Sequence, residues 1–215
     1  MNLSNLSEIA TYIVSEGKGI LAADESNPTC KKRFDTISVE STEENRRDYR
    51  ELLFSSKGMS GNIGGVILFD ETIRQKAEAG QSLVDLILES GALPGIKVDK
   101  GLKPFNDSEV ETLTQGLDDL DERCAEYAKL GAKFTKWRAV INIGDEIPTQ
   151  ECIDANMEAL AKYAKIAQKN GMVPIVEPEV LINGNHTIED CYDATNRSIK
   201  SLFDYLKSCL LYTSP

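Results

Sequence analysis

Three short apolar segments of the chain each carry two charged side chains at alternate positions. Because successive side chains along a strand point to opposite faces, the two charges of each segment are predicted to share one face. The pairs are Lys97 and Asp99 in residues 96–100, Lys136 and Arg138 in residues 134–138, and Glu177 and Glu179 in residues 175–179. Charged groups are costly to bury unless they meet one another or a ligand. Cations and carboxylates on neighbouring strands therefore indicate a site for binding and proton transfer.

The basic residues of these segments have two interpretations. Lys136 and Arg138 suit a phosphate or a polarised hydroxyl, because the guanidinium offers a planar fork of donors. Alternatively they belong to a solvent-facing edge strand, or they pair with carboxylates of the core. Lys97 and Asp99 likewise either contact a ligand or form an internal salt bridge between neighbouring strands.

The acidic segment contains a proline between its two carboxylates. Pro178 has no backbone donor, so it is predicted to end the hydrogen-bonded ladder of its strand. Two close carboxylates raise the pKa of one of them, which is what a general acid needs near neutral pH. The alternative is that Glu177 and Glu179 each bind a cation of a neighbouring strand.

A further polar cluster follows the apolar residues 19–24. Asp24 or Ser26 is predicted from spacing alone to cap a helix. The functional interpretation instead places Asp24 at the tip of a strand and Arg33 over the mouth of a barrel.

Missing motifs narrow the chemistry further. His186 is the only histidine and lies in a polar segment, where we expect a surface residue. A metal-dependent mechanism therefore lacks its usual ligands, and we expect no cofactor. No glycine-rich nucleotide motif follows any predicted strand. Lysines and carboxylates remain, and a lysine amine can form an iminium with a ketone while carboxylates move protons.

The elements that must position these residues alternate between strands and helices. Two more strand-like runs, residues 19–24 and 65–69, precede the three charged segments. Such alternation predicts an α/β fold with a parallel sheet, and charges at the strand ends favour a (β/α)₈ barrel. A barrel needs eight strands and about 250 residues. The chain offers five strands, so it is either an open sheet or a barrel without its last three strands.

Capping motifs mark where several helices begin and end. Ser41 and Glu44 have capping-box spacing before a helix that extends through Leu53, and Thr187 and Asp190 have it before another. The turn residues Asn170 and Gly171 are predicted to stop a third helix.

Composition excludes several classes of protein. The net charge of −11 argues against a nucleic-acid partner, and no apolar run is long enough to cross a membrane. The five cysteines are widely spaced, as expected for reduced thiols in the cytoplasm.

Several motifs follow one another in a fixed order along the chain. They are residues 17–26, 42–47, 64–69, 95–101, 114–118, 136–138 and 173–179. In sequence and spacing these motifs closely resemble the class I family of fructose-1,6-bisphosphate aldolases, the Schiff-base enzymes of glycolysis. The resemblance extends from about residue 1 to about residue 207.

The resemblance implies roles for four residues near the first strand. Asp24 resembles a catalytic aspartate that contacts the substrate and helps to order the lysines. Ser26, Thr29 and Arg33 match a region that closes on the substrate and binds one phosphate. Thr29 stands where the family is expected to have serine, but it keeps the hydroxyl.

It also implies roles on the later strands. Lys97 resembles a substrate-binding lysine near the cleaved bond, and Arg138 resembles a phosphate ligand. Lys136 resembles the catalytic lysine that assists cleavage. Glu177 resembles the acid/base that dehydrates the carbinolamine, and Glu179 resembles the glutamate that positions the iminium lysine.

For the fold, the resemblance implies a (β/α)₈ TIM barrel of which about the first five βα units are present. Residues 1–207 form the partial barrel domain, and residues 208–215 are an aberrant tail. The iminium-forming lysine of the family lies on the sixth strand, in a Leu-Leu-Lys-Pro-Asn-type motif that residues 208–215 do not match. We therefore expect no normal turnover from this chain alone.

For function, the resemblance implies reversible cleavage of fructose 1,6-bisphosphate to dihydroxyacetone phosphate and glyceraldehyde 3-phosphate. The family is usually a cytosolic homotetramer that acts on sugar phosphates without a metal. One alternative is a non-catalytic phosphate-binding or assembly fragment. Another is a different iminium-forming barrel such as a transaldolase, which fits the chemistry but not the ordered motifs.

Overall fold

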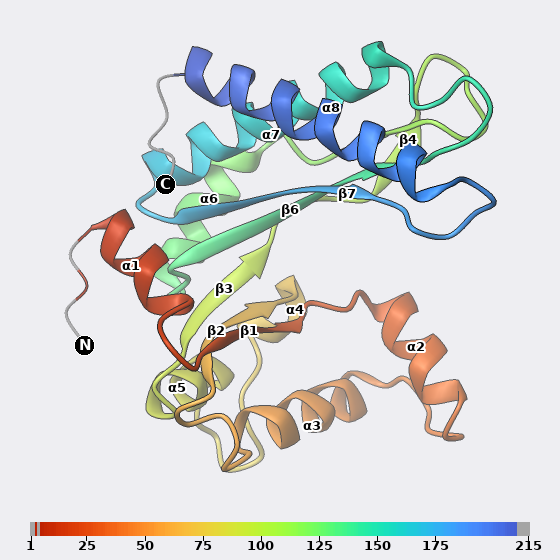
Figure 1. The fold of residues 1–215 in the computed structure, drawn as a ribbon. Coiled ribbons are helices and arrows are strands. Elements are labelled where there is room, and N and C mark those ends of the chain that lie inside the picture. The colour runs from red at the N-terminus through yellow and green to blue at the C-terminus, as the bar shows by residue number, and fades with distance from the viewer. Residues whose placement is uncertain (1–2, 4, 210–215) are drawn as a thin grey trace. The chain divides into compact units, whose positions relative to one another are not determined.

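A computed structural model describes residue 3 and residues 5–209 as alternating helices and strands (Figure 1). The helices are α1 (Leu6–Ile13), α2 (Asn27–Asp35), α3 (Glu43–Phe54), α4 (Asp70–Ile73), α5 (Leu83–Glu89), α6 (Leu120–Lys129), α7 (Gln150–Lys169) and α8 (Ile188–Ser208). The strands are β1 (Gly19–Ala23), β2 (Ile63–Leu68), β3 (Leu93–Lys97), β4 (Leu102–Pro104), β5 (Thr112–Thr114), β6 (Phe134–Ile141) and β7 (Val173–Val180). The main sheet has the order β1-β2-β3-β6-β7, and β4 pairs with β5.

The chain divides into two compact units. The N-terminal unit comprises residues 1–97, 125–135 and 171–173, and the C-terminal unit comprises the remaining residues. Candidate site residues occur in both units, so each unit is described separately below.

In the N-terminal unit, β1, β2 and β3 pair in parallel. The β1–β2 register ends with Ala23 opposite Leu68. Small residues on these strands make room for one aromatic ring, because a Cβ at Gly65 or Gly95 would collide with the buried Phe134. Helix α1 packs on β2 and α5 packs on β3, while α2 lies beyond the carboxyl end of β1 (Figure 1).

In the C-terminal unit, α7 and α8 pack side by side (Figure 1). Trp137 on β6 is fully buried and stacks on Tyr163 of α7, with ring centroids 5.4 Å apart. The side-chain amide of Asn156, also on α7, donates to the carbonyl of Thr112 on β5 at 2.8 Å. Helix α7 is thus joined to β6 by an aromatic stack and to the hairpin β4–β5 by a hydrogen bond.

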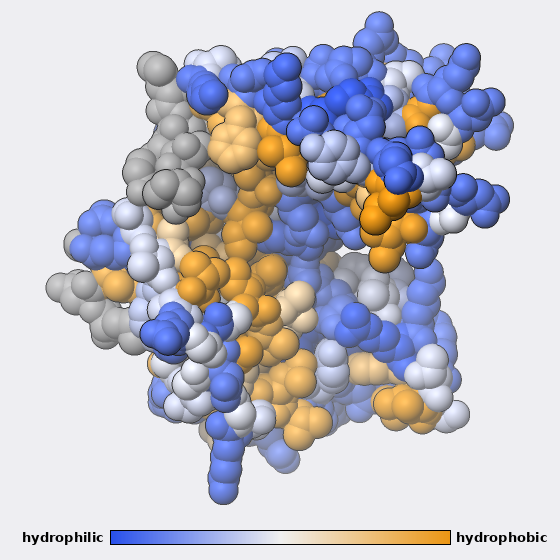
Figure 2. Space-filling view, viewed as in Figure 1, coloured by the Kyte–Doolittle hydropathy of each residue, from blue (hydrophilic) through white to orange (hydrophobic). Residues whose placement is uncertain are grey.

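Helix α8 carries an exposed apolar stripe. Hydrophobic atoms reach the surface along it in Figure 2, and Ile188, Ile199 and Phe203 are 80%, 44% and 43% exposed. Their spacing places them on one side of the helix. The buried residues Ala194, Ser198, Leu202 and Leu206 form the stripe that adjoins them. The apolar stripe of the helix is therefore broad, and only one part of it is buried.

The α/β class and the five main strands were predicted correctly, but Pro178 was interpreted wrongly. Strand β7 continues through Pro178 to Val180 instead of ending there. The physical reason is the direction of the backbone groups, since the N–H groups of Val173 and Leu181 donate to Lys133 and Ile141, so that alternation turns the nitrogen of Pro178 away from β6.

Other boundaries also differ from the prediction. Strand β3 ends at Lys97, so Asp99 lies beyond the strand. Thr42, not Ser41, caps α3 by accepting from the backbone N–H of Asn45. The capping box of Thr187 and Asp190 is confirmed.

Two short helices and one hairpin were not predicted at all, whereas α2 begins directly after Ser26, one of the two residues predicted to cap a helix. The unpredicted elements are α4, α5 and the pair β4–β5. The aberrant tail predicted for residues 208–215 lies outside the described residues except for Ser208, which ends α8, and Cys209, which caps it. None of the described helices combines the length and the hydropathy needed to span a bilayer.

Candidate active site

The first group of predicted site residues lies between β1 and α2, in the N-terminal unit. Strand β1 ends at Ala23, and Asp24 follows directly at its carboxyl end. Ser26 occupies the N-cap position of α2, although its side chain makes no capping hydrogen bond. Its hydroxyl instead lies 3.1 Å from the hydroxyl of Thr29. Two predicted phosphate ligands are therefore neighbours at the start of α2.

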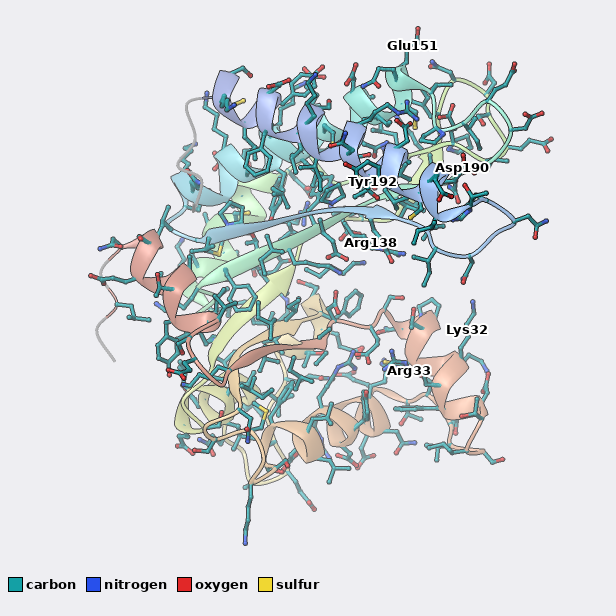
Figure 3. All side chains as sticks on the ribbon, in the orientation of Figure 1. Lys32, Arg33, Arg138, Glu151, Asp190 and Tyr192 are labelled. Atoms are coloured by element: carbon teal, nitrogen blue, oxygen red, sulfur yellow. The ribbon has the colours of Figure 1, made fainter. Side chains whose placement is uncertain are left out.

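The third predicted ligand, Arg33, projects from the same helix and is labelled in Figure 3. Its guanidinium forms an ion pair with Glu25 and lies 3.4 Å from the hydroxyl of Tyr49. The Arg33 side chain is 58% exposed, whereas that of Glu25 is 6% exposed. Arg33 is thus anchored at one side by a buried carboxylate and open to solvent at the other.

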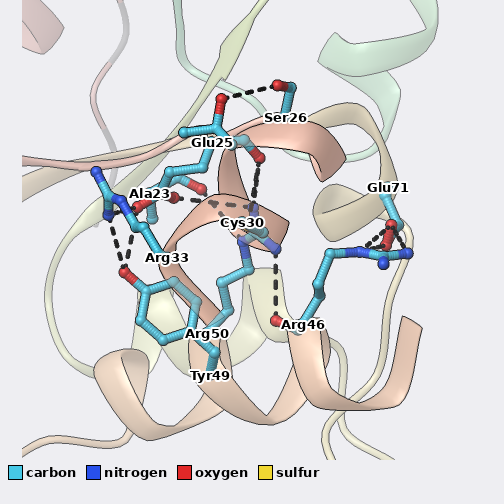
Figure 4. Close-up of polar contacts among 10 residues, drawn as sticks. Ala23, Glu25, Ser26, Cys30, Arg33, Arg46, Tyr49, Arg50 and Glu71 are labelled. Atoms are coloured by element: carbon cyan, nitrogen blue, oxygen red, sulfur yellow. Dashed lines mark hydrogen bonds and ion pairs between the residues drawn. The ribbon is translucent and has the colours of Figure 1, made fainter. Parts of the chain in front are cut away.

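Glu25 is the centre of a buried polar cluster, which Figure 4 shows in close-up. The hydroxyl of Tyr49 donates to Glu25 Oε1 at 3.1 Å, and Arg50 Nη2 lies 3.8 Å from Oε2. Arg50 also donates to the main-chain carbonyls of Ala23, at 3.3 Å, and Glu25, at 2.7 Å. We call Glu25, Arg33, Tyr49 and Arg50 the Glu25 cluster.

Burial within this cluster keeps two neutral groups protonated. It raises the pKa of Tyr49, with the nearby Glu25 charge adding to the effect. Burial also raises the pKa of the Cys30 thiol, although Arg50 acts in the opposite direction. Both groups therefore remain neutral near pH 7.

The second group of predicted site residues lies on β6 and β7, in the C-terminal unit. Lys136 Nζ lies 3.2 Å from Glu177 Oε2. Arg138, labelled in Figure 3, forms an ion pair with Glu179. The backbone N–H of Arg138 also lies 3.5 Å from Asp99 Oδ2. Each glutamate thus has a cation partner on the neighbouring strand, which is the arrangement of the alternative interpretation.

The pattern of burial on β6 agrees with the predicted alternation. Trp137 is fully buried, while Lys136 and Arg138 on either side of it are partly exposed. The Lys136 side chain is 12% exposed and that of Arg138 is 39% exposed. The two cations therefore share the face opposite Trp137. We call the Lys136–Glu177 and Arg138–Glu179 ion pairs the strand pairs.

Lys97 is the last residue of β3 and is partly buried. It belongs to the N-terminal unit, and its position at the carboxyl end of a parallel strand is the one predicted from the sequence. In doubly wound and barrel folds such ends carry the ligand-binding residues.

Two functional features were missed from the sequence. Arg50 was not singled out, and Glu25 was quoted only within a motif. Arg50 lies 25 positions after Glu25 on a different element, so no local pattern connects them. The full burial of Arg50 on α3 would have marked it, but burial of an arginine cannot be read from the sequence.

Thiols and metals offer no second centre among the described residues. Burial raises the pKa of Cys124 to about 11 and that of Cys152 to about 12, so both stay as thiols at neutral pH. Within residues 5–209 no group of three or more His, Cys, Asp or Glu side chains is arranged to hold a metal ion.

A family model described as "Fructose-bisphosphate aldolase class-I" matches residues 5–213 of the chain. The chain belongs to the class I fructose-bisphosphate aldolase family. The resemblance inferred from its ordered motifs is therefore confirmed.

Aldolase relatives match nearly the whole chain. A "Probable fructose-bisphosphate aldolase class 1" of Xylella fastidiosa is 52% identical over 206 residues, which are 96% of this chain and 62% of the relative. "Fructose-bisphosphate aldolase 5, cytosolic" of Arabidopsis thaliana is 51% identical over 94% of this chain and 56% of its own length. The chain thus spans about three-fifths of the length of these relatives.

A solved aldolase also shares the fold. The structure of fructose-bisphosphate aldolase from Plasmodium falciparum, in complex with TRAP and a small-molecule inhibitor, matches with a TM-score of 0.90 at 50% identity. The match covers 92% of this chain and 58% of that one. The predicted fold class, a partial (β/α)₈ barrel, is therefore confirmed.

Proposed function

We propose that this chain supplies the supporting part of an aldolase site that cleaves fructose 1,6-bisphosphate reversibly through a lysine Schiff base. The observation that carries the proposal is the Lys136–Glu177 pair at 3.2 Å, in a chain whose residues 5–213 match the aldolase family. A carboxylate held beside an ammonium group is suited to proton transfer, because either partner can exchange a proton with a bound hydroxyl.

The chemistry explains why such a pair is needed. A lysine amine adds to the ketone of the substrate, and the resulting carbinolamine loses water only when its hydroxyl is protonated. We assign that proton to Glu177. The iminium then accepts the electron pair of the breaking carbon–carbon bond, and Lys136 assists cleavage at the substrate hydroxyl. The iminium lysine itself belongs to the part of the aldolase barrel beyond the span matched here.

The other predicted residues take supporting roles. We assign Glu179 to positioning the iminium lysine and Arg138 to a substrate phosphate. Asp24 contacts the substrate, and Lys97 lies near the cleaved bond. Their ion pairs and places at strand ends support these roles, because a partly exposed charged side chain can exchange its protein partner for a ligand.

Ser26, Thr29 and Arg33 are assigned to a second phosphate. The exposure of Arg33 and the adjacent hydroxyls of Ser26 and Thr29 support this role. Arginine and hydroxyl groups together satisfy several phosphate oxygens.

We further propose that residues 1–207 form one partial barrel domain and that residues 208–215 are an aberrant tail, of which residues 208–213 still fall within the span of the family model. The exposed stripe on α8 and the terminal place of β7 in the sheet are where further βα units would pack. A cytoplasmic homotetramer without a nucleic-acid partner is the assembly proposed for the whole protein.

An extended protein tests the proposed function. Residues 1–207 are joined to the part of the Xylella fastidiosa relative that lies beyond the matched span, and cleavage of fructose 1,6-bisphosphate is followed by a coupled assay. We expect turnover, and we expect Lys136→Met to lower kcat by about 100-fold or more, as removal of a proton-transfer group does. A folded extended protein without turnover, beside an active relative, contradicts the proposal.

The 215-residue chain by itself has a second candidate function, which is phosphate binding without catalysis. The exposed guanidinium of Arg33 favours it. Calorimetric titration with a sugar phosphate shows whether the 215-residue chain binds phosphate or does not. Weak binding that Arg33→Met abolishes supports the binding function, and absence of any heat of binding excludes it.

A further inference from the structure

Helix α3 carries one arginine that is completely removed from solvent. The side chain of Arg50 is 0% exposed. Burying a charge is costly unless hydrogen bonds and an opposite charge compensate for it. The contacts that compensate for Arg50 therefore indicate what the residue does in this fold.

Two of those contacts flank Asp24. Arg50 Nε donates to the carbonyl of Ala23 at 3.3 Å, and Arg50 Nη2 donates to the carbonyl of Glu25 at 2.7 Å (Figure 4). The residue between these carbonyls is Asp24. The register of β1 with β2 ends at Ala23. The guanidinium of Arg50 thus hydrogen-bonds the backbone at the point where the pairing of β1 with β2 ends.

The remaining contacts brace the fork itself. Arg50 Nη1 donates to the carbonyl of Arg46 one turn earlier on α3, at 3.4 Å. The Glu25 carboxylate lies 3.8 Å from Nη2 and also receives the Tyr49 hydroxyl. The guanidinium is therefore fixed from its own helix and from the segment that it holds. A fork with several donors can bridge two carbonyls in this way, whereas a lysine ammonium is a single compact charge.

We propose that Arg50 is a positioning residue, which holds the backbone on both sides of Asp24 and so fixes the place of the Asp24 carboxylate. The importance of this placement for the reaction rests on the proposed function, in which Asp24 contacts the substrate. Arg50 itself is buried and acts only through the segment from Ala23 to Glu25.

Arg46 provides a matched control on the same helix. It lies one turn before Arg50, and its side chain is 11% exposed. It forms an ion pair with Glu71 at 2.8 Å and donates to the carbonyl of Ser41 at 2.6 Å. Arg46→Met therefore also removes a nearly buried ion pair from α3, but the contacts that it removes reach Glu71 and Ser41 instead of the segment around Asp24.

The first experiment uses the 215-residue chain and does not depend on activity. Backbone ¹⁵N order parameters are measured for Asp24, Glu25 and Ser26 in the wild type, Arg50→Lys, Arg50→Met and Arg46→Met. We expect order parameters of about 0.85 in the wild type and in Arg46→Met. We expect order parameters below about 0.6 in Arg50→Met and intermediate ones in Arg50→Lys. Arg50→Lys keeps the charge and decides the question if Arg50→Met does not fold. Unchanged order parameters in a folded Arg50 variant overturn the proposal.

The second experiment separates positioning from general stabilisation and uses the extended protein. We expect Arg50→Met to lower kcat for fructose 1,6-bisphosphate about 100-fold, because a displaced contacting group costs about that much, while KM changes little. Arg50→Lys is expected to recover part of the loss, and Arg46→Met to stay close to the wild type. Equal losses in Arg46→Met and Arg50→Met, or a change confined to KM, overturn the positioning role. If the unmutated extended protein is inactive, the proposed function fails, and the order parameters still decide whether Arg50 holds the segment.

Discussion

The Glu25 cluster and the strand pairs are both built from arginine or lysine and glutamate, but they differ in burial. In the cluster, Glu25 is 6% exposed and Arg50 is 0% exposed. In the strand pairs, Glu177 and Glu179 are 36% and 38% exposed. The Glu25–Arg50 pair is therefore out of contact with water, although Arg33 of the same cluster is 58% exposed, whereas the two glutamates of the strand pairs are partly exposed.

The difference separates two functions of an ion pair. A buried pair must satisfy almost all of its donors and acceptors within the protein, so it fixes the backbone around it. A half-exposed pair contributes little to stability, because solvent screens it, and each partner can be given up to a ligand. The Glu25–Arg50 pair is therefore suited to fixing the segment around Asp24, and the strand pairs are suited to exchanging a partner for a ligand.

The largest effect on stability is expected from neutralising the carboxylate of the cluster. Glu25→Gln leaves the buried Arg50 without its opposite charge, and breaking a buried pair in this way costs about 3 kcal/mol or more in the free energy of unfolding. Urea unfolding of the 215-residue chain measures it. Glu179→Gln is the matched substitution in a strand pair. Equal losses of unfolding free energy in Glu25→Gln and Glu179→Gln would show that the two kinds of ion pair contribute equally to stability.

An intermediate effect is expected for the less exposed strand pair. Lys136 is 12% exposed and lies 3.2 Å from Glu177. A double-mutant cycle with Lys136→Met and Glu177→Gln should give a coupling energy of about 1 kcal/mol, as found for residues in direct contact. A coupling as large as the loss expected for Glu25→Gln would show that this pair is also a rigid structural element.

The smallest effect is expected for the more exposed strand pair. Arg138 and Glu179 are both more than one-third exposed. A surface pair of this kind contributes about 0.5 kcal/mol, and the coupling should decrease further as salt is added. A double-mutant cycle at low and high ionic strength measures it. A coupling that salt does not change would place the pair in an environment closer to that of the Glu25 cluster.

Period-two alternation was enough to predict the strand pairs from the sequence. It placed Lys136 and Arg138 on one face of β6 and Glu177 and Glu179 on one face of β7, and the ion pairs agree with both placements. Alternation could not show which glutamate pairs with which cation, because strand order and register are tertiary features. The direction in which the nitrogen of Pro178 faces is likewise a tertiary feature, so the sequence could not show that β7 continues through this residue.

The Glu25 cluster could not be predicted in the same way. Its defining contacts join α3 to the segment after β1, across 25 positions of sequence. A long amphipathic arginine on a helix is usually exposed, so its type and position gave no reason to expect full burial. The ordered motifs identified the family and the region, whereas the support beneath Asp24 became visible only in three dimensions.

The most direct test of the account is a trapping experiment with sodium borohydride and dihydroxyacetone phosphate. Borohydride reduces an iminium to a stable amine, and mass spectrometry of the digested protein then locates the modified lysine. We predict that the extended protein is modified at one lysine of the added part and that the 215-residue chain is not modified at a comparable rate. Rapid modification of Lys97, Lys136 or any other lysine of the 215-residue chain would contradict the claim that these residues support a Schiff base formed elsewhere.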